Sequence, residues 1–248
     1  MHRARVIPCL LIRGNGLVKT KKFKDAVYIG DPVNAVRIFS DKEADEIVVL
    51  DIDASKNGSD INYQLIEEMA GEAFMPMAYG GGIRTLAQIR QLIRLGIEKV
   101  VINTAAVESI NVIREAADVF GSQAIVGAVD IKKNLFGGYK ICVKSATIDV
   151  KRTLDDHVGD LVAAGVGEIF INNVDRDGTM IGYDLKPILG VTSKVNVPVV
   201  VCGGAGSMDD LAYAIREGNV SGVAAGSMFV FHGKHRAVLI NYPTDIRL

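Results

Sequence analysis

Eight short apolar runs recur along the chain, and segments with helical spacing of apolar residues separate them. The runs are rich in valine and isoleucine and cover residues 5–12, 46–51, 76–79, 99–103, 123–130, 168–173, 197–202 and 221–225. Nearly continuous apolar runs are typical of parallel strands that are buried on both faces. Their alternation with helices predicts an α/β fold, a single (β/α)₈ TIM barrel.

Helix start signals fall between the runs, as this interpretation requires. Asp31 followed by Pro32 is typical of an N-cap and a first helical residue. Thr85 with Gln88 matches a capping box, in which each side chain reaches the other residue's backbone amide. Two long connections, residues 12–30 and 131–150, follow the first and fifth runs. Because chemistry in this fold occurs at the carboxyl ends of the strands, we interpret both as functional loops.

The two halves of the sequence match each other at an offset of 122 residues. Residues 76–105 match residues 198–227, with Gly82 opposite Gly204 and Thr104 opposite Gly226. One duplication of half the chain indicates two fused half-barrels rather than a repeat array. No linker-like stretch or change in composition divides the chain, so we expect residues 1–248 to form a single domain.

Each copy of this repeat joins a glycine turn to a helix start. Glycine lets the backbone approach a ligand closely, and the unpaired amides of a helix start carry partial positive charge, so such a place suits a phosphate. Two of these turns on one mouth of the barrel predict a small molecule that is phosphorylated at both ends.

Composition narrows the classes of partner. The formal net charge of −1 argues against general affinity for nucleic acid or an anionic membrane, and no signal peptide or membrane span is expected. Three cysteines, Cys9, Cys142 and Cys202, lack C-x-x-C spacing, so we expect neither disulfides nor a zinc site and interpret them as buried small apolar groups. We therefore expect a cytoplasmic protein without metal or cofactor.

Asp130 is the candidate catalytic residue because it ends the fifth run, in AIVGAVD. A carboxylate in that place would act as a general acid or base, although it could instead cap the next turn. Aligning RVIPCLLIR with AIVGAVDIK puts Leu11 opposite Asp130. A symmetric barrel with a paired acid and base would need a second carboxylate there, and leucine cannot move a proton.

Three further residues follow strands on the same side. Asp51 ends the second run, and Asp177 with Gly178 follows the sixth, in VDRDGT. Asp177 and Gly178 could offer a carboxylate and a turn amide to a ligand. An Asx turn that stabilises the loop is nearly as good an explanation of this spacing.

Four charged residues mark the opposite end of the barrel. Each of them begins an apolar run, and they are Arg5, Glu46, Lys99 and Glu168. Two positive and two negative side chains could neutralise one another in a ring around the axis. The ring would either serve stability, as features of that face usually do, or control access to the barrel interior.

The chain resembles HisF, the cyclase subunit family of imidazole glycerol phosphate synthase, over essentially its whole length. The matching stretches include RVIPCL, GDPVNAVRIF, ADEIVVLDIDAS, YGGGIRTLAQIR, EKVVINTAAV, FGSQAIVGAVD, GEIFINNVDRDGT and CGGAGSMDDL. The resemblance implies a barrel that receives ammonia from a HisH-type glutaminase docked on its N-terminal face. It also implies a reaction that joins this ammonia to a doubly phosphorylated ribotide, giving imidazole glycerol phosphate and aminoimidazole carboxamide ribotide.

The resemblance also implies residue roles. Arg5, Glu46, Lys99 and Glu168 would form the ammonia gate. The phosphate contacts would be Gly82, Asn103, Thr104, Asp177, Gly178, Gly204, Gly226 and Ser227. Lys19 and Asp51 match family positions in the active-site mouth.

Three departures from the family pattern lie in the same mouth. Leu11 stands where the family has the second catalytic aspartate, Asn172 replaces a threonine and Cys202 replaces a serine. This pattern resembles a branch of HisF-like proteins that occurs with surface-polysaccharide genes, where the ammonia is used to make an amidino group on a nucleotide-linked sugar. Three hypotheses follow: the family's cyclase reaction, amidination of a nucleotide sugar, and a conduit that activates a glutaminase without chemistry of its own.

Overall fold

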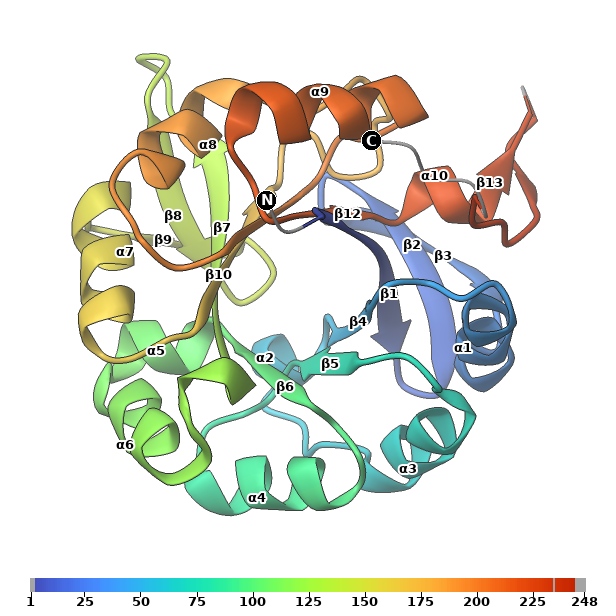
Figure 1. Ribbon diagram of the computed structural model, residues 1–248, viewed down its shortest axis with the longest axis horizontal. Coiled ribbons are helices and arrows are strands. Elements are labelled where there is room, and N and C mark those ends of the chain that lie inside the picture. The colour runs from blue at the N-terminus through green and yellow to red at the C-terminus, as the bar shows by residue number, and fades with distance from the viewer. Residues whose placement is uncertain (1–2, 234, 244–248) are drawn as a thin grey trace.

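The computed structural model describes residues 3–233 and 235–243, and its centre is a closed barrel of parallel strands (Figure 1). Each barrel strand pairs with the next, and β10 also pairs with β7, which closes the ring. The eight strands are β1 (Arg5–Arg13), β4 (Ile47–Asp51), β5 (Met77–Gly80), β6 (Lys99–Ile102), β7 (Ile125–Lys133), β10 (Glu168–Asn173), β11 (Val199–Cys202) and β12 (Gly222–Ala225). The predicted (β/α)₈ barrel is confirmed.

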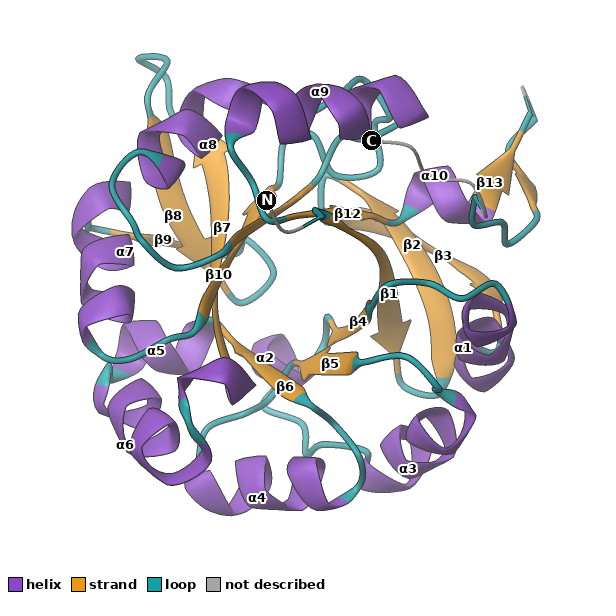
Figure 2. Cartoon of the chain, in the orientation of Figure 1, coloured by secondary structure: helices purple, strands orange, loops and turns teal. Residues whose placement is uncertain are grey.

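Helices surround the barrel and connect its strands (Figure 2). The longer ones are α1 (Pro32–Asp41), α3 (Tyr63–Glu72), α4 (Leu86–Arg94), α6 (Asn111–Phe120), α7 (Leu154–Ala163), α8 (Leu185–Thr192) and α9 (Met208–Gly218). Short helical segments are α2 (Ala54–Asn57), α5 (Thr104–Glu108), the 3₁₀ turn η1 (Ser122–Ala124) and α10 (Ser227–Val230). Within the described part of the chain, no helix has the length and hydropathy needed to cross a membrane.

The predicted helix caps are confirmed. The Asp31 carboxylate accepts a hydrogen bond from the Asn34 amide, with Pro32 in the first turn of α1. Thr85 and Gln88 form the capping box that starts α4. These caps satisfy amide groups that have no partner inside the helix, which fixes where each helix leaves its barrel strand.

Two apolar layers explain why the barrel strands appear as continuous apolar runs. On β1, Val6, Leu10 and Ile12 pack outward against the helices, whereas Ile7 and Cys9 pack into the barrel. Successive side chains of a strand point to opposite faces, and here both faces are buried. All three cysteines are buried and free, as predicted.

The two long connections contain strands that the apolar pattern did not predict. After β1 the chain forms β2 (Gly16–Lys21) and β3 (Lys24–Gly30), and after β7 it forms β8 (Tyr139–Val143) and β9 (Ile148–Val150). β2 pairs antiparallel with β1, and β8 pairs antiparallel with β7. The expectation of loops was therefore wrong in part, because these segments extend the barrel strands and build walls around the mouth. A small pair, β13 (Phe231–His232) with β14 (Ala237–Val238), follows α10.

Candidate functional site

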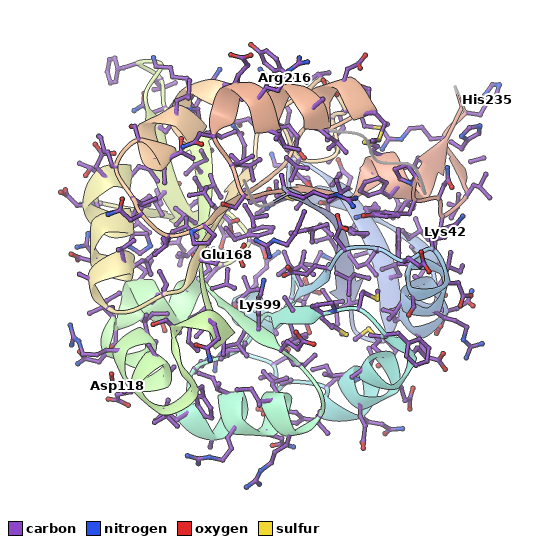
Figure 3. The ribbon with its side chains drawn as sticks, viewed as in Figure 1. Lys42, Lys99, Asp118, Glu168, Arg216 and His235 are labelled. Carbon is purple, nitrogen blue, oxygen red and sulfur yellow. The ribbon has the colours of Figure 1, made fainter. Side chains whose placement is uncertain are left out.

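The four charged residues at the strand starts form one closed ring. Lys99 Nζ donates to Glu46 Oε1 and Oε2 at 2.9 and 2.8 Å and to Glu168 Oε2 at 2.9 Å. Arg5 hydrogen-bonds to the same two glutamates with its two terminal nitrogens. Lys99 and Glu168 lie together near the barrel axis in Figure 3. Because both glutamates are buried, the ring carries two anions whose charges are compensated within the ring.

Apolar side chains fill the barrel interior between the ring and the mouth, and we call this interior the bore. A small cavity lies directly above the ring, and both glutamates line it together with hydrocarbon side chains. These are Ile7, Val48, Ala78, Val101, Val126, Phe170 and Val200. Two of them, Val101 and Phe170, also line the larger pocket that opens at the mouth. The ring and the mouth are therefore separated by side chains that hold no polar group.

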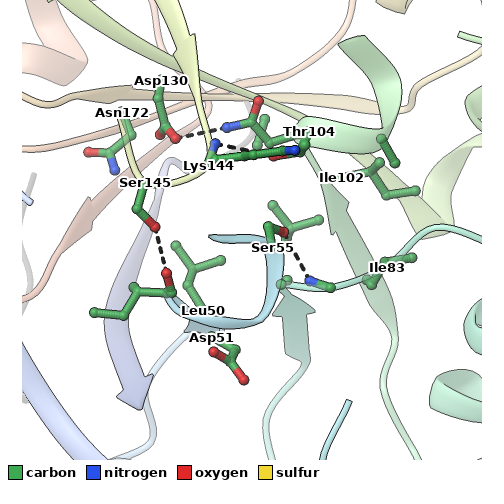
Figure 4. Close-up of a pocket in the computed structure, with 18 of the residues that line it drawn as sticks. Leu50, Asp51, Ser55, Ile83, Ile102, Thr104, Asp130, Lys144, Ser145 and Asn172 are labelled. Atoms are coloured by element: carbon green, nitrogen blue, oxygen red, sulfur yellow. Dashed lines mark hydrogen bonds between the residues drawn. The ribbon is translucent and has the colours of Figure 1, made fainter. Parts of the chain in front are cut away.

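Asp130 lies in the pocket at the mouth, which we call the central pocket (Figure 4). Its Oδ2 accepts a hydrogen bond of 2.8 Å from Asn103 Nδ2. Burial raises the pKa of Asp130 to about 7, while hydrogen bonds from Asn172 and Asn103 act in the opposite direction. A carboxyl group with this pKa exchanges protons near neutral pH. Leu11 lines the same pocket and is itself buried, so the structure holds one ionisable carboxylate where a paired site would hold two.

The first glycine turn borders the central pocket. Gly82 and Thr104 line it, but the Gly82 amide already donates to Ser55 Oγ at 3.2 Å. Thr104 Oγ1 accepts from the Lys144 amide at 3.4 Å. Gly81 has a φ of 118°, and a Cβ there would lie 2.5 Å from the Asp51 carbonyl oxygen, so the turn requires glycine.

The second glycine turn lines a smaller pocket, which we call the anion pocket. Lys19 lines it although only 5% of this residue is exposed, and its Nζ donates to the Cys9 carbonyl oxygen at 2.6 Å. A Cβ on Gly226 would lie 2.1 Å from Lys19 Nζ, so the ammonium group rests directly on this glycine. The same pocket collects four other predicted residues, namely Asp177, Gly178, Gly204 and Ser227. A buried lysine beside glycine backbone is suited to an anion.

Two of the predicted aspartates bind the protein's own loops. Asp177 Oδ2 accepts from Thr20 Oγ1 at 2.7 Å and from the Phe23 amide at 3.3 Å, which fastens the β2–β3 turn. Asp51 Oδ1 accepts from the amides of Asp53 and Ala54 at 2.9 and 3.0 Å. Burial raises the pKa of both aspartates. The contacts of Asp177 reach the β2–β3 turn and not its own loop, so they are not the Asx turn considered for this residue, and both aspartates also line pockets.

Sequence reasoning gave no role to two residues that the β8–β9 connection brings over the central pocket. Lys144 and Ser145 line it, and Ser145 Oγ donates to the Ile52 carbonyl oxygen (Figure 4). Their backbone is left-handed, with φ of 52° and 56°. Position after a barrel strand was the only available signal, because nothing in their local sequence indicates which side chains face inward.

Fold and site together define a (β/α)₈ barrel protein whose pockets lie at the carboxyl ends of the strands, where barrel enzymes carry their active sites. The model of a family described as "Histidine biosynthesis protein" matches residues 5–236. The chain belongs to this histidine biosynthesis family, in which it is a HisF-like paralogue.

Named relatives support this placement at two levels of similarity. The chain is 54% identical to the "Putative imidazole glycerol phosphate synthase subunit hisF2" of Pseudomonas aeruginosa over 98% of its length and 97% of the relative's. It is 48% identical to the "Putative imidazole glycerol phosphate synthase subunit hisF3" of Vibrio vulnificus, with 98% and 94% covered. It is 40% identical to the "Imidazole glycerol phosphate synthase subunit HisF" of Alkaliphilus metalliredigens, with 94% and 92% covered.

Proposed function

We propose that this chain is the synthase subunit of a glutaminase-coupled enzyme and that it adds ammonia to a phosphorylated substrate beside Asp130. The observation that carries the proposal is the arrangement along the barrel axis: a charged ring, an apolar bore and then a carboxyl group with a pKa of about 7. The names of the relatives, which are imidazole glycerol phosphate synthase subunits, support the family reaction as the first candidate.

Each part of the axis has a role in this proposal. The ring of Arg5, Glu46, Lys99 and Glu168 is the gate through which ammonia enters from a HisH-type glutaminase docked on the N-terminal face. The bore carries neutral ammonia upward, because hydrocarbon walls disfavour an ion. Asp130 then accepts a proton from the nitrogen that attacks the substrate and returns it to a leaving group.

The two glycine turns hold the ends of the substrate in this proposal. Lys19, Gly204, Gly226 and Ser227 bind one phosphate in the anion pocket, with Gly178 and Asp177 at its edge. Gly82, Asn103 and Thr104 bind the other beside the central pocket, where Asp51 lies at the rim. Asp130 lies between them, so a substrate held at both ends presents its middle to the ammonia.

An ammonia-dependent assay tests the family reaction. The purified chain is mixed with excess ammonium salt and the formimino ribulosyl ribotide, and formation of imidazole glycerol phosphate is followed. Product above the buffer rate, lost in Asp130→Asn, supports the proposal, and product at the buffer rate rejects this reaction. If Asp130→Asn leaves glutamine-dependent product formation unchanged in the complex, Asp130 does no chemistry and the barrel is a conduit.

A second candidate function follows from Leu11. Ring closure and elimination need several proton transfers, and Leu11 leaves Asp130 without a carboxylate opposite it on β1. Amidination of a nucleotide sugar in surface-polysaccharide synthesis keeps the ammonia supply and needs less acid and base chemistry. Deletion of the gene tests this candidate, because an unaltered surface polysaccharide in the deletion strain would reject it.

A further inference from the structure

The central pocket and the anion pocket meet at two side chains. Leu11 and Asn172 line both pockets, from β1 and β10. We call this passage the neck. A ligand whose phosphate occupies the anion pocket and whose reacting part lies beside Asp130 must pass between these two residues.

Asn172 presents an unused hydrogen-bond acceptor at the neck. Only 5% of this residue is exposed, and within the described residues its Oδ1 has no hydrogen-bond partner. A Cβ placed on Gly203 would lie 3.0 Å from that oxygen, so Oδ1 faces the second glycine turn and the anion pocket. The amide nitrogen faces the other way, toward Asp130, whose pKa it helps to lower.

A buried acceptor without a donor destabilises the folded protein, and such groups in native structures usually meet a ligand or water. The opposite wall of the neck gives the Asn172 oxygen no help, because Leu11 is apolar and 7% exposed. The neck therefore has one wall that accepts a hydrogen bond and one wall that packs against hydrocarbon. A chain carbon with a hydroxyl on one side and hydrogen on the other satisfies both walls at once.

The size of the anion pocket indicates how far the hydroxyl-bearing carbon lies from the phosphate. The cavity is small, about 30 Å³, which is room for about two water-sized groups, so it takes only the end of an extended ligand. The atoms that follow the phosphate ester therefore already lie at the neck. Asn172 Oδ1 is therefore placed to accept a hydrogen bond from a hydroxyl close to the phosphate.

We propose that Asn172 is a specificity-determining residue that accepts a hydrogen bond from a hydroxyl on the carbon chain adjoining the substrate's phosphate. This inference rests on the phosphate site of the proposed function and extends it to the chemistry of the neighbouring carbons. The other end of the same amide faces Asp130 and helps to lower its pKa, so a bound hydroxyl also fixes the orientation of the amide beside the carboxylate.

Three probes separate the phosphate from the hydroxyl. Calorimetry measures the affinity of the full chain for inorganic phosphate, glycerol 3-phosphate and 3-hydroxypropyl phosphate, which lacks only the hydroxyl next to the phosphate-bearing carbon. We expect the native protein to prefer glycerol 3-phosphate over 3-hydroxypropyl phosphate about 5- to 10-fold, the range of one neutral hydrogen bond. In Asn172→Leu, which has a similar shape, the preference should fall to about 1, with the affinity for inorganic phosphate unchanged within about twofold.

Asn172→Asp is the matched control, because it keeps the acceptor and adds a charge. It should weaken all three phosphates and retain the preference for the hydroxyl. If Asn172→Leu does not fold by circular dichroism, Asn172→Val replaces it, since a β-branched side chain suits a strand.

The outcomes separate this inference from the proposed function. No preference in the native protein, or an undiminished preference in Asn172→Leu, overturns the role of Asn172 while leaving the phosphate site intact. A native protein that binds none of the three phosphates overturns the phosphate site and this inference together.

Discussion

Replacing Asp130 with asparagine should stabilise the protein at neutral and alkaline pH. Asparagine has nearly the same shape, and its Oδ1 can keep accepting from Asn103 Nδ2, which lies 2.8 Å from the native carboxylate. What changes is the cost of ionisation. Burial raises the pKa of Asp130 to about 7, so the folded protein holds this group with a proton that the unfolded chain releases near pH 4.

The direction of the pH dependence follows from that difference. A group whose pKa is raised on folding contributes its full stability below the unfolded value and loses it as pH rises through the folded value. Native stability should therefore fall between about pH 4 and pH 7 relative to Asp130→Asn, and the difference should be constant above that. A rise from about 3.9 to about 7 corresponds to about 4 kcal/mol when fully expressed. Asp130 keeps some contact with solvent, so screening reduces the expected difference to about 2 kcal/mol.

Urea unfolding of both proteins at pH 4.5, 6, 7 and 8 measures the effect. The other titrating groups are shared, so the difference between the two free energies of unfolding isolates Asp130. Asp118→Asn is the control, because Asp118 is exposed on α6 and should give no such pH trend. A constant difference between Asp130→Asn and the native protein across this range would refute the raised pKa and, with it, the assignment of Asp130 as a neutral-pH acid or base.

Three other substitutions test separate parts of the site. Lys99→Met leaves two buried glutamates with one cation and should lower the free energy of unfolding, measured in urea, by about 2–3 kcal/mol. Adding Glu168→Gln to this variant should recover about 1 kcal/mol. No recovery would mean that the ring members act independently. Gly226→Ala puts a methyl group where Lys19 Nζ lies and should weaken the binding of inorganic phosphate, measured by calorimetry, at least about tenfold. An unchanged affinity would show that Lys19 does not bind the anion. Leu11→Asp puts a carboxylate opposite Asp130 in the central pocket. It should lower the free energy of unfolding by about 3 kcal/mol at pH 7 and raise the rate of ammonia-dependent cyclisation about 10²-fold. An unchanged rate would show that Leu11 alone does not limit that reaction.

The barrel could be predicted because its strands are buried on both faces. On β1, side chains facing the helices and side chains facing the axis are both apolar, which leaves an uninterrupted run in the sequence. The ring could be predicted for a related reason, since Arg5 and Lys99 begin β1 and β6 and strand starts share one end of a parallel barrel.

The mouth could not be predicted in the same way. β3 is mostly exposed and β8 is only partly buried, so neither leaves a long apolar run. Strand ends also indicate which residues reach the mouth but not what those residues bind. Asp51 and Asp130 look alike in the sequence and line the same pocket, yet Asp51 accepts from two backbone amides of its own loop and Asp130 accepts from the Asn103 side chain.

In the proposed ammonia route, the hydrocarbon lining of the bore determines the protonation state in which nitrogen reaches the substrate. Val48, Ala78 and Val200 offer a passing cation nothing to replace its water, so the route favours the free base over its conjugate acid. Ammonia that enters through the ring at the N-terminal face would reach the substrate unprotonated and therefore nucleophilic. Ammonium salt in the solvent is mostly protonated at neutral pH. The reaction rate with added ammonium salt should therefore rise with pH, whereas the rate with glutamine as the nitrogen source should change little.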